Sequence, residues 1–506
     1  MSNQYSNLPG VNMSIKDGQL LLTNDRTSNS MLIIAEARTH RNTPEGPVLV
    51  TSESELKENF GGYFHQGTLN PIAAQWAIAR QNGIRNIYLM ALGSAGKKEQ
   101  FADLHNKLFN LMADLSLSYI VVDGLYADEE ITGLVASDFG LESFDDVDTI
   151  PAIYRRVASD AIEDELGDEI HTLELVFNSG KIYIGNPAGS LDVNELNKSL
   201  QEALSLELPH VKATISDEGN NKIVTISASE AFEIGEGSEW FKLKDSELET
   251  EGHGNVGLLL AEYAEKVSTE VGETIVFMGV KPPTSVDLAG IKEHVSALVK
   301  RDNAVSPYLQ VVAGPQVGVS LPGNLRMQWV SGVTQYAALV SGLSPQNAPT
   351  NQLLPGAAAL RYNLSLRQLN DLTGSKYVTF HVKNGQIRVV DGVTTAPDLF
   401  VGQDIVKSDF TRLSTLRIVN FMVREIRNAC DAYIGSPNEF ANYNAMNTSI
   451  KGVIDMAIDR GIIQDARYSI KLGESLDSSD IDLTILPQFE LRTINVTVGL
   501  STPDNF

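Results

Sequence analysis

The stretch of this sequence that comes nearest to a catalytic motif is Leu92–Gln100, which reads LGSAGKKEQ and lies between a predicted strand and a predicted helix. A glycine-rich turn in that position could bind phosphate groups through its backbone N–H groups. The spacing is Gly-x-x-Gly-Lys-Lys, whereas a phosphate loop needs Gly-x-x-x-x-Gly-Lys followed by Ser or Thr, and no hydroxyl follows Lys97 to hold magnesium. We therefore interpret this stretch as a structural connection.

The other side chains that could do chemistry are scattered along the chain. The eight histidines form no His-x-x-x-His or His-x-x-Glu-His pair, and no Gly-x-Ser-x-Gly elbow occurs. The one cysteine, Cys430, excludes an intrachain disulfide and a Cys-x-x-Cys metal site. It falls on the apolar face of a predicted helix, which favours a core residue over a reactive thiol. The sequence therefore predicts a chain that is not an enzyme, with no catalytic residue, no metal site and no cofactor.

An arginine stripe is predicted on the helix from Thr415 to Gly435. Arg417, Arg424 and Arg427 follow one another at i, i+7 and i+10, so they share one side of that helix. A second face is apolar and contains Leu416, Val419, Val423, Ile426, Cys430 and Tyr433. Two interpretations of the stripe stay open: a solvated face paired locally with Glu425, or a contact with an acidic partner surface.

Length and charge limit the classes of protein that this chain can belong to. Its 506 residues exceed what one hydrophobic core usually supports, so we expect two to four domains. No apolar run approaches the roughly 18 residues that a membrane span needs, and the first residues do not form a secretory signal. The net charge of −25 predicts repulsion from nucleic acid and from anionic membranes. We expect synthesis in a reducing cytosol, with neither a nucleic acid nor a membrane as partner.

The rhythm of helices and strands predicts the domains. Alternating helix and strand patterns on both sides of an acidic segment indicate a largely parallel sheet. The acidic segment, with 20 acidic and 6 basic residues over 160–250, reads as two hairpins and a helix, which makes a compact α+β insert. The predicted fold is thus a mixture of α/β and α+β domains: an N-terminal arm at 1–30, a central α/β domain at 31–160 and 252–384, an acidic inserted domain at 161–251, and a C-terminal α+β domain at 385–506.

Strand-like segments stand at both ends of the chain. Near the C-terminus Ile494, Val496, Val498 and Leu500 alternate with polar residues, and near the N-terminus Val11, Met13 and Ile15 do the same. The chain ends six residues after Leu500, so we expect no following strand to pair with it and predict that it joins the sheet of another copy. The linker Gly473–Asp480 could reach roughly 25 Å when extended, which is long enough for such an exchange.

The order of these segments resembles the tail sheath proteins of contractile bacteriophages and related contractile injection machines. The resemblance is strongest over about 341–500, where it rests on three stretches, and it is weaker over 31–92 and 256–314 and absent from the acidic segment. The three stretches are SGLSPQNAPTNQLLPGAAAL, LSLRQLNDLTGSKYVTFHVKNGQIRVVDGVTTA and the segment from TLRIVNF to ARYSI. Near the N-terminus, LPGV opens an arm of the same kind.

This resemblance implies a structural subunit that polymerises helically, in stacked rings around a tail tube, by strand exchange between copies. It further implies a subtilisin-like middle domain, contacts with baseplate and tail terminator proteins, a place in the virion tail, and assembly in the cytoplasm of a host bacterium. Arg417, Arg424 and Arg427 would then be the candidates that face the tube. Two alternatives remain: an α/β hydrolase-like enzyme, which the missing triad disfavours, and another tail tube or baseplate protein.

Overall fold

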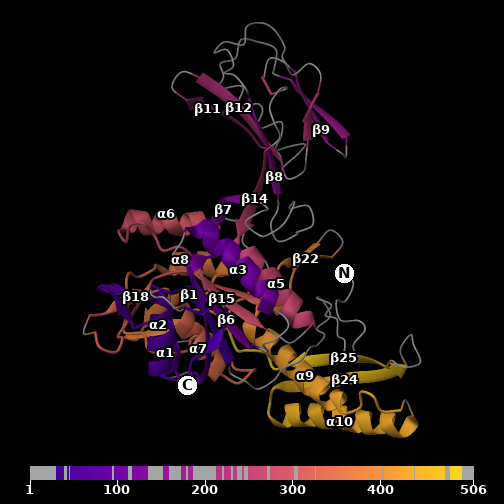
Figure 1. Cartoon of the computed structure of the whole chain (residues 1–506). Helices are drawn as coiled ribbons and strands as arrows, with labels where there is room; N and C mark the ends of the chain where they lie inside the picture. The colour runs from indigo at the N-terminus through magenta and orange to yellow at the C-terminus, as the bar shows by residue number, and fades with distance from the viewer. Residues whose placement is uncertain are drawn as a thin grey trace, which may run out of the picture. The chain divides into compact units, whose positions relative to one another are not determined.

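The fold is taken from a computed structural model that describes most of the chain (Figure 1). The described residues are 30–38, 43–44, 46–93, 96–111, 117–134, 152–158, 172–177, 180–185, 212–218, 221–228, 232–235, 242–243, 249–270, 274–300, 306–324, 326–401, 404–437, 439–472 and 479–492. The chain divides into two compact units. Unit 1 comprises Met1–Ser94, Lys107–Glu129 and Val256–Phe506, and unit 2 comprises Ala95–Asn106 and Glu130–Asn255.

Unit 1 is built around a six-stranded sheet with the order β16-β15-β6-β1-β5-β2. Its first five strands are parallel to one another, and only β2 at the edge runs antiparallel, against β5. The strands are β1 (Ser30–Glu36), β2 (Val48–Leu49), β5 (Asn86–Leu92), β6 (Tyr119–Tyr126), β15 (Ile275–Gly279) and β16 (Leu309–Val312). In chain order the parallel strands lie in the sequence 2-1-3-4-5, which is the flavodoxin-like arrangement of doubly wound sheets.

The central strands are continuous apolar runs because helices and loops cover them. Met31–Ala35 of β1 are fully buried, as expected of a parallel strand that is covered on both faces. The helices that connect the sheet strands are α1 (Glu53–Asn59), α2 (Pro71–Gln81), α3 (Lys97–Leu111), α5 (Val256–Glu270) and α6 (Leu288–Val299). Helix α2 packs on β1, β5 and β6 and also contacts α7 (Val333–Gly342), which packs on β6 and β15.

The sequence predicts a helix that Asn70 caps and Pro71 begins, followed by a buried strand at Ile84–Leu92, and α2 and β5 lie there. Pro71 occupies the first turn as predicted, and the strand that follows, β5, is buried. Asn70 precedes the helix, but its side chain does not cap it. The Asn70 amide group instead donates to the carbonyls of Phe60 and Gly62, at 2.8 and 3.0 Å, and fastens the preceding loop. Hydrogen bonding of the buried loop has therefore replaced the expected cap.

The rest of unit 1 consists of short hairpins and the C-terminal helices. A three-stranded sheet has the order β18-β17-β19, and the pairs β3–β4, β20–β21, β22–β23 and β24–β25 are each antiparallel. The elements are β3 (Phe64–His65), β4 (Thr68–Leu69), β17 (Val317–Val319), β18 (Gln328–Val330), β19 (Ala359–Leu360), α8 (Leu366–Gly374), β20 (Phe380–Lys383), β21 (Gln386–Val389), β22 (Asp398–Val401), β23 (Asp404–Lys407), a 3₁₀ turn (Asp409–Thr411), α9 (Leu413–Asp431), α10 (Phe440–Asp459), β24 (Ile463–Leu472) and β25 (Ser479–Pro487).

Unit 2 contains antiparallel sheets. One has five strands in the order β11-β12-β8-β14-β7, and the other has three in the order β10-β9-β13. The strands are β7 (Glu130–Leu134), β8 (Ala152–Val157), β9 (Thr172–Phe177), β10 (Gly180–Gly185), β11 (Lys212–Glu218), β12 (Asn221–Ala228), β13 (Phe232–Ile234) and β14 (Glu249–Asn255). The hairpins predicted over 173–185 and 211–228 are confirmed as β9–β10 and β11–β12. The helix predicted over 191–208 lies outside the described residues.

The predicted acidic insert, 161–251, lies within unit 2, but unit 2 starts earlier on the chain. Strand β14 pairs with both β7 and β8, so residues from Glu130 onward belong to the same sheet as the acidic segment. Sequence periodicity cannot reveal such pairing between distant strands, since each strand alone has the same pattern in either unit. The mixed α/β architecture expected of the chain is confirmed.

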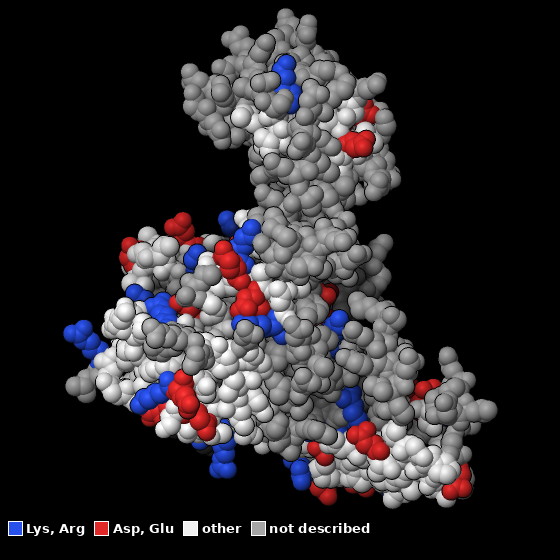
Figure 2. All heavy atoms as spheres, in the orientation of Figure 1, with Lys and Arg blue, Asp and Glu red and all other residues white. Residues whose placement is uncertain are grey.

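Charge is mixed over the surface that is described. On the face seen in Figure 2, lysine and arginine side chains are interspersed with aspartate and glutamate, and the described residues show no large patch of one sign there. Among the described residues, no helix is both long and apolar enough to cross a membrane.

Candidate functional site: the C-terminal hairpin and its anchor

The carboxyl edge of the parallel sheet is where an enzyme of this architecture would bind its ligand. At this edge the polar side chains around Asp123 bond to one another. The side-chain amide of Gln75 donates through Nε2 to the Asp123 carboxylate at 2.6 Å. The Thr334 hydroxyl donates to the side-chain oxygen Oε1 of Gln75 at 2.6 Å. Ser331 donates to the second carboxylate oxygen of Asp123 at 3.2 Å. These bonds join α2, β6 and the start of α7 and commit the Asp123 carboxylate to internal hydrogen bonding.

The C-terminal hairpin β24–β25 is organised in the opposite way. Its two strands pair in antiparallel register from Ile463 with Pro487 to Leu472 with Ser479, and among the described residues neither strand pairs with a third. One face of β25 is buried through Leu483 and Ile485, whereas the side chain of Leu486 is exposed. A strand edge that no neighbouring strand covers is a template for pairing with another strand.

Helices α9 and α10 pack on the buried face of the hairpin. The Tyr443 hydroxyl on α10 donates to the carbonyl of Ile470 at 2.7 Å, and the Tyr468 hydroxyl on β24 donates to the Asn447 side chain at 2.8 Å. Cys430 of α9 is buried, and burial raises the pKa of its thiol to about 11. The thiol therefore stays protonated at neutral pH, which agrees with the prediction of a core residue.

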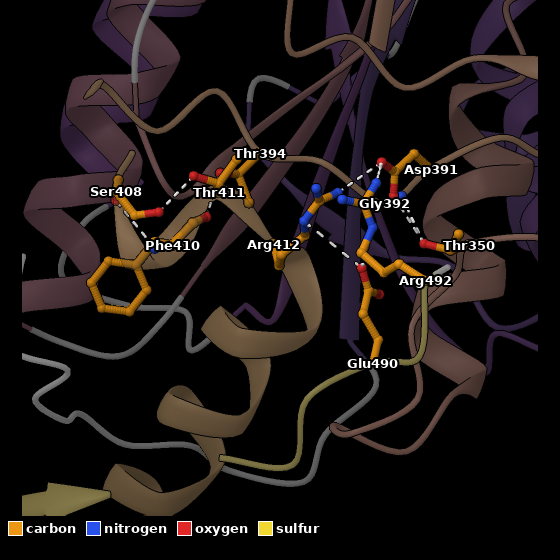
Figure 3. A network of polar contacts seen from close by, with 10 residues as sticks. All are labelled: Thr350, Asp391, Gly392, Thr394, Ser408, Phe410, Thr411, Arg412, Glu490 and Arg492. Carbon is orange, nitrogen blue, oxygen red and sulfur yellow. Dashed lines mark hydrogen bonds and ion pairs between the residues drawn. The ribbon is translucent and has the colours of Figure 1, made fainter. Parts of the chain in front are cut away.

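An ionic network fastens the segment after β25 to the body of unit 1 (Figure 3). Asp391 is nearly buried, and its carboxylate accepts hydrogen bonds from Arg412 at 2.7 Å, from Arg492, and from the Thr350 hydroxyl at 3.1 Å. Glu490 lies between the same two arginines, 3.8 Å from Arg412 and 3.2 Å from Arg492. We call these four charged residues, Asp391, Arg412, Glu490 and Arg492, the anchor.

The anchor is electrically balanced, with two carboxylates and two guanidinium groups. Burial raises the pKa of Glu490, and the neighbouring Asp391 carboxylate raises it further, while Arg412 and Arg492 lower it. The two carboxylates are largely buried, with 4% of the Asp391 side chain and 12% of the Glu490 side chain exposed, so each needs its guanidinium partners, since a buried charge without its partner is costly. Asp391 follows β21, Arg412 precedes α9, and the other two follow β25, so the anchor joins three places on the chain.

The predicted arginine stripe is not a solvated face in this structure. The Arg417 guanidinium is buried and donates to the carbonyls of Leu343 and Ser344, at 2.6 and 3.3 Å. These carbonyls follow the C-terminus of α7, where positive charge is favoured. Arg424 is buried as well. It pairs with Glu425 at 3.1 Å and lies 5.3 Å from the centre of the Phe421 ring.

Burial of the guanidinium lowers the pKa of Arg424 to about 10, and Arg427 is half-buried. Of the two interpretations left open for the stripe, the solvated face does not hold for the buried Arg417 and Arg424, although Arg424 does pair with Glu425 as that interpretation expected. The guanidinium groups of Arg417 and Arg424 already interact with groups of the same chain. The helical spacing of these arginines in the sequence does not reveal those partners. Contact of Arg417, Arg424 and Arg427 with a tube remains a prediction that nothing in the chain's own packing favours.

The terminal strands lie outside the described residues. This concerns Val11, Met13 and Ile15 at the N-terminus and Ile494, Val496, Val498 and Leu500 at the C-terminus. The linker prediction is corrected, however. The last two residues of that linker, Ser479 and Asp480, belong to β25, and β25 pairs with β24 of the same chain from Ser479 to Pro487, so the linker does not carry β25 to another copy.

Sequence analysis missed the anchor, and α10 begins earlier than predicted. From the run NTSIKGVIDMAIDRG the sequence predicts a helix capped near Asn447 or Thr448, but α10 starts at Phe440 after the N-cap Glu439. Asn442, Asn444 and Asn447 all lie inside it, so residues that favour caps misled the boundary. The anchor could have been suspected from one signal: Glu490 and Arg492 alternate with Phe489 and Leu491, an unusual mixture of charge and apolar bulk.

Solved structures of the same fold are known. A chain of the anti-feeding prophage (AFP) baseplate in the contracted state aligns over 98% of this chain and 99% of that chain, with a TM-score of 0.51 and 13% identity. The six-fold symmetrised AFP baseplate gives the same coverage and TM-score at 10% identity. A chain of an extracellular contractile injection system, the PVC sheath complex in the contracted state, aligns over 97% and 98% with a TM-score of 0.49 and 10% identity.

No family model and no curated protein sequence matches the chain. The likeness therefore lies in the fold, which this chain shares along nearly its whole length with chains of the AFP baseplate. The two of these structures with TM-scores of 0.51 are both structures of the AFP baseplate.

Proposed function

We propose that this chain is the structural subunit of a contractile tail sheath. The observation that carries the proposal is the shared fold with AFP baseplate chains over 98% of this chain. The residues at 341–500 that resemble tail sheath proteins select the sheath among the components of such a machine. Fold alone does not determine function, so the residues at the site must add to it.

The hairpin supplies the second line of support. Strands β24 and β25 have ten and nine residues, and in the described part of the chain their outer edges are unpaired. Native proteins usually cover or disrupt edges of this length, so such an edge favours a partner strand. We propose that the segment at 494–500 of another copy pairs there, in stacked rings around a tube. Burial of its four apolar side chains would contribute about 6–12 kcal/mol before ordering costs.

In this mechanism the strand joints between copies persist while the interfaces between domains rearrange. The free energy of contraction comes from interfaces that are better satisfied in the short form than in the long form. A tube protein, baseplate proteins and a tail terminator are the proposed partners. The proposed place of work is the virion tail, after assembly in the cytoplasm of a host bacterium. The proposal has two finer parts. The middle domain is subtilisin-like, and helix α9 contacts the tube.

Electron microscopy of the purified full-length chain tests the proposal. We expect hollow, striated cylinders, and a truncation that lacks residues 493–506 should stay folded but form none. Normal cylinders from the truncated chain would refute strand exchange through this segment. A full-length chain that never forms cylinders, even when a tube protein is supplied, would refute the sheath itself.

A second candidate function is a sheath-like component of the baseplate, because the two solved structures with TM-scores of 0.51 are baseplate assemblies. A baseplate component should form closed rings of defined size, whereas a sheath subunit forms cylinders of variable length. The same micrographs distinguish the two. The hydrolase alternative is disfavoured by the filled sheet edge around Asp123.

A further inference from the structure

The hairpin β20–β21 closes with a two-residue turn at Asn384 and Gly385. Its strands pair as far as Lys383 with Gln386, and the two turn residues have φ angles of +54° and +72°. Two consecutive left-handed residues are typical of a type I′ turn, for which Asn-Gly is a favoured sequence. Both turn residues are exposed, so water reaches the tip of the hairpin.

An asparagine that precedes glycine can react with its own backbone, because glycine has no side chain to shield its nitrogen. The backbone nitrogen of Gly385 would attack Cγ of Asn384 and lose its proton. A nitrogen–carbon bond then closes a five-membered succinimide ring, the Cγ–Nδ2 bond breaks, and the amide leaves as ammonia. Water next opens the ring at one of its two carbonyls, which gives either aspartate or isoaspartate. The reaction needs no oxidant, metal or other co-reactant.

We propose that Asn384 is a site of spontaneous deamidation in this chain. The dipeptide Asn-Gly occurs twice in the sequence, at 82–83 and at 384–385, so composition alone does not select one of them. The surroundings of the two copies in the fold do select Asn384. The inference goes beyond the proposed function and does not depend on it, because it concerns only the chemistry of this hairpin tip.

Hydrogen bonds protect the other copy of the dipeptide. The side-chain amide of Asn82 donates to the carbonyl of Ile78 at 2.8 Å, and the Gly83 N–H donates to the carbonyl of Arg80 at 3.2 Å. Within the described residues, neither the Asn384 side chain nor the Gly385 N–H has a hydrogen bond. Attack requires rotation about the asparagine backbone, which costs least at an exposed hairpin tip.

Positive charge surrounds the reacting nitrogen at the hairpin tip. Lys383 bonds to the side-chain oxygen of Asn351 at 3.2 Å, and Arg388 bonds to the Asn351 carbonyl at 2.7 Å and to Gln386 at 2.6 Å. In the described part of the chain, neither cation pairs with a carboxylate. Burial lowers the pKa of His381, and the charges of Lys383 and Arg388 lower it further. The same charges stabilise the negative charge that develops when Gly385 loses its proton.

The two products have different consequences for the hairpin. Aspartate keeps the length of the backbone and places a carboxylate beside Lys383. Isoaspartate carries the backbone through the side chain of residue 384 and so adds one carbon atom to a two-residue turn. Because turn length fixes the register of a hairpin, the isoaspartate form should disturb the pairing of Lys383 with Gln386.

Incubation of the purified full-length chain at pH 8, followed by peptic digestion in acid and mass spectrometry, tests the proposal. Acid keeps the amides from reacting further during the digestion. We expect the amide-to-acid mass change to accumulate at Asn384 at least about tenfold faster than at Asn82, since two hydrogen bonds must break before Asn82 reacts. Equal rates at the two positions, or no change at Asn384, would overturn the proposal.

Substitution of a neighbouring lysine tests the role of charge. Lys383→Gln should slow the reaction at Asn384 about two- to threefold, because it removes one unit charge beside the reacting nitrogen. Lys292→Gln, at an exposed lysine of α6, should leave the rate unchanged. If the two variants react at the same rate, the electrostatic part of the proposal is wrong.

The variant Asn384→Asp separates the two products. It carries aspartate at this position in every copy, and aspartate tolerates the left-handed backbone of the turn. Hydrogen exchange over 380–389 should stay close to that of the fresh wild type in this variant and should accelerate in the isoaspartate fraction of the aged chain. Equal exchange in the variant and the isoaspartate fraction would refute the predicted disturbance of the turn.

Discussion

The parallel sheet and the C-terminal hairpin, both in unit 1, satisfy their polar and apolar groups in different ways. The sheet buries β1 completely, and the Asp123 carboxylate at its carboxyl edge is satisfied by neighbours from the same chain. In the described residues, the hairpin has unpaired outer edges, and it is followed by exposed Phe489 and Leu491. In the described part of the chain, the sheet is thus covered by groups of its own chain, whereas the hairpin has edges that no third strand covers.

The largest expected difference in stability is between two phenylalanine-to-alanine substitutions, one in the parallel sheet and one in the segment after the hairpin. Phe277 of β15 is fully buried, with ring centres 5.9 Å from Tyr119 and 5.7 Å from Tyr336. Phe277→Ala should lower the free energy of unfolding by about 3–5 kcal/mol, because it leaves a cavity in the core. Phe489→Ala should change it by less than about 0.5 kcal/mol, since that ring is exposed. Chemical denaturation under conditions that keep the chain monomeric measures both, and similar losses would break the comparison.

A smaller effect is expected at the anchor. Asp391→Asn should cost about 1–3 kcal/mol, because it leaves Arg412 and Arg492 without their shared carboxylate. The loss should be local: hydrogen exchange should accelerate over 479–492 while β1 stays protected. Asp398→Asn is the matched control. Its pair with Lys376, at 3.0 Å, is more exposed, so the loss should stay below about 1 kcal/mol. Equal protection of 479–492 in both variants would show that the anchor does not hold the segment.

The smallest effect is a pH dependence at Glu490. Its pKa is raised by burial, so the folded chain keeps this proton at pH values where the unfolded chain has lost it. The stabilisation is fully present below the unfolded pKa and disappears as the pH rises through the folded one. The stability of wild type relative to Glu490→Gln should therefore increase as the pH falls from 7 toward 4.5, as measured by denaturation midpoints.

Asp287 offers a control of opposite sign for this titration. A hydrogen bond from the Gly290 amide lowers the pKa of Asp287, so its contribution is present above the unfolded pKa and is lost as the pH falls through the lowered value. Wild type relative to Asp287→Asn should lose stability at acidic pH. If both variants shift in the same direction, a general acid effect accounts for the result and Glu490 has no special role.

The sequence allowed prediction of the elements and of much of the fold class, because both depend on local patterns. Buried strands such as β5 and β15 are apolar runs, and Pro71 marks the start of α2. Pairings between strands that are distant in the sequence could not be predicted from local patterns. Nothing near Ser479–Pro487 indicates that it pairs with β24 of the same chain, and nothing near Glu130 reveals its sheet with β14.

The candidate site was predicted only in outline. The alternating terminal segments directed attention to the C-terminus, but the anchor depends on Asp391 and Glu490, which are 99 positions apart in the sequence and meet only in the fold. The arginine stripe was misleading for a similar reason. Helical spacing tells which side chains share a face of α9, but it cannot tell that the carbonyls of Leu343 and Ser344 lie opposite Arg417.

That contact has a mechanical consequence. Arg417 ties α9 to the C-terminus of α7, and α7 rests directly on β6 and β15. A force applied to α9 is therefore transmitted to the sheet through the charge-assisted hydrogen bonds of Arg417 and through the packed helix α7. Close packing and charge-assisted hydrogen bonds make both contacts rigid. If the assembled particle shortens, the sheet and α9 should move as one rigid body, and the chain must bend at other positions.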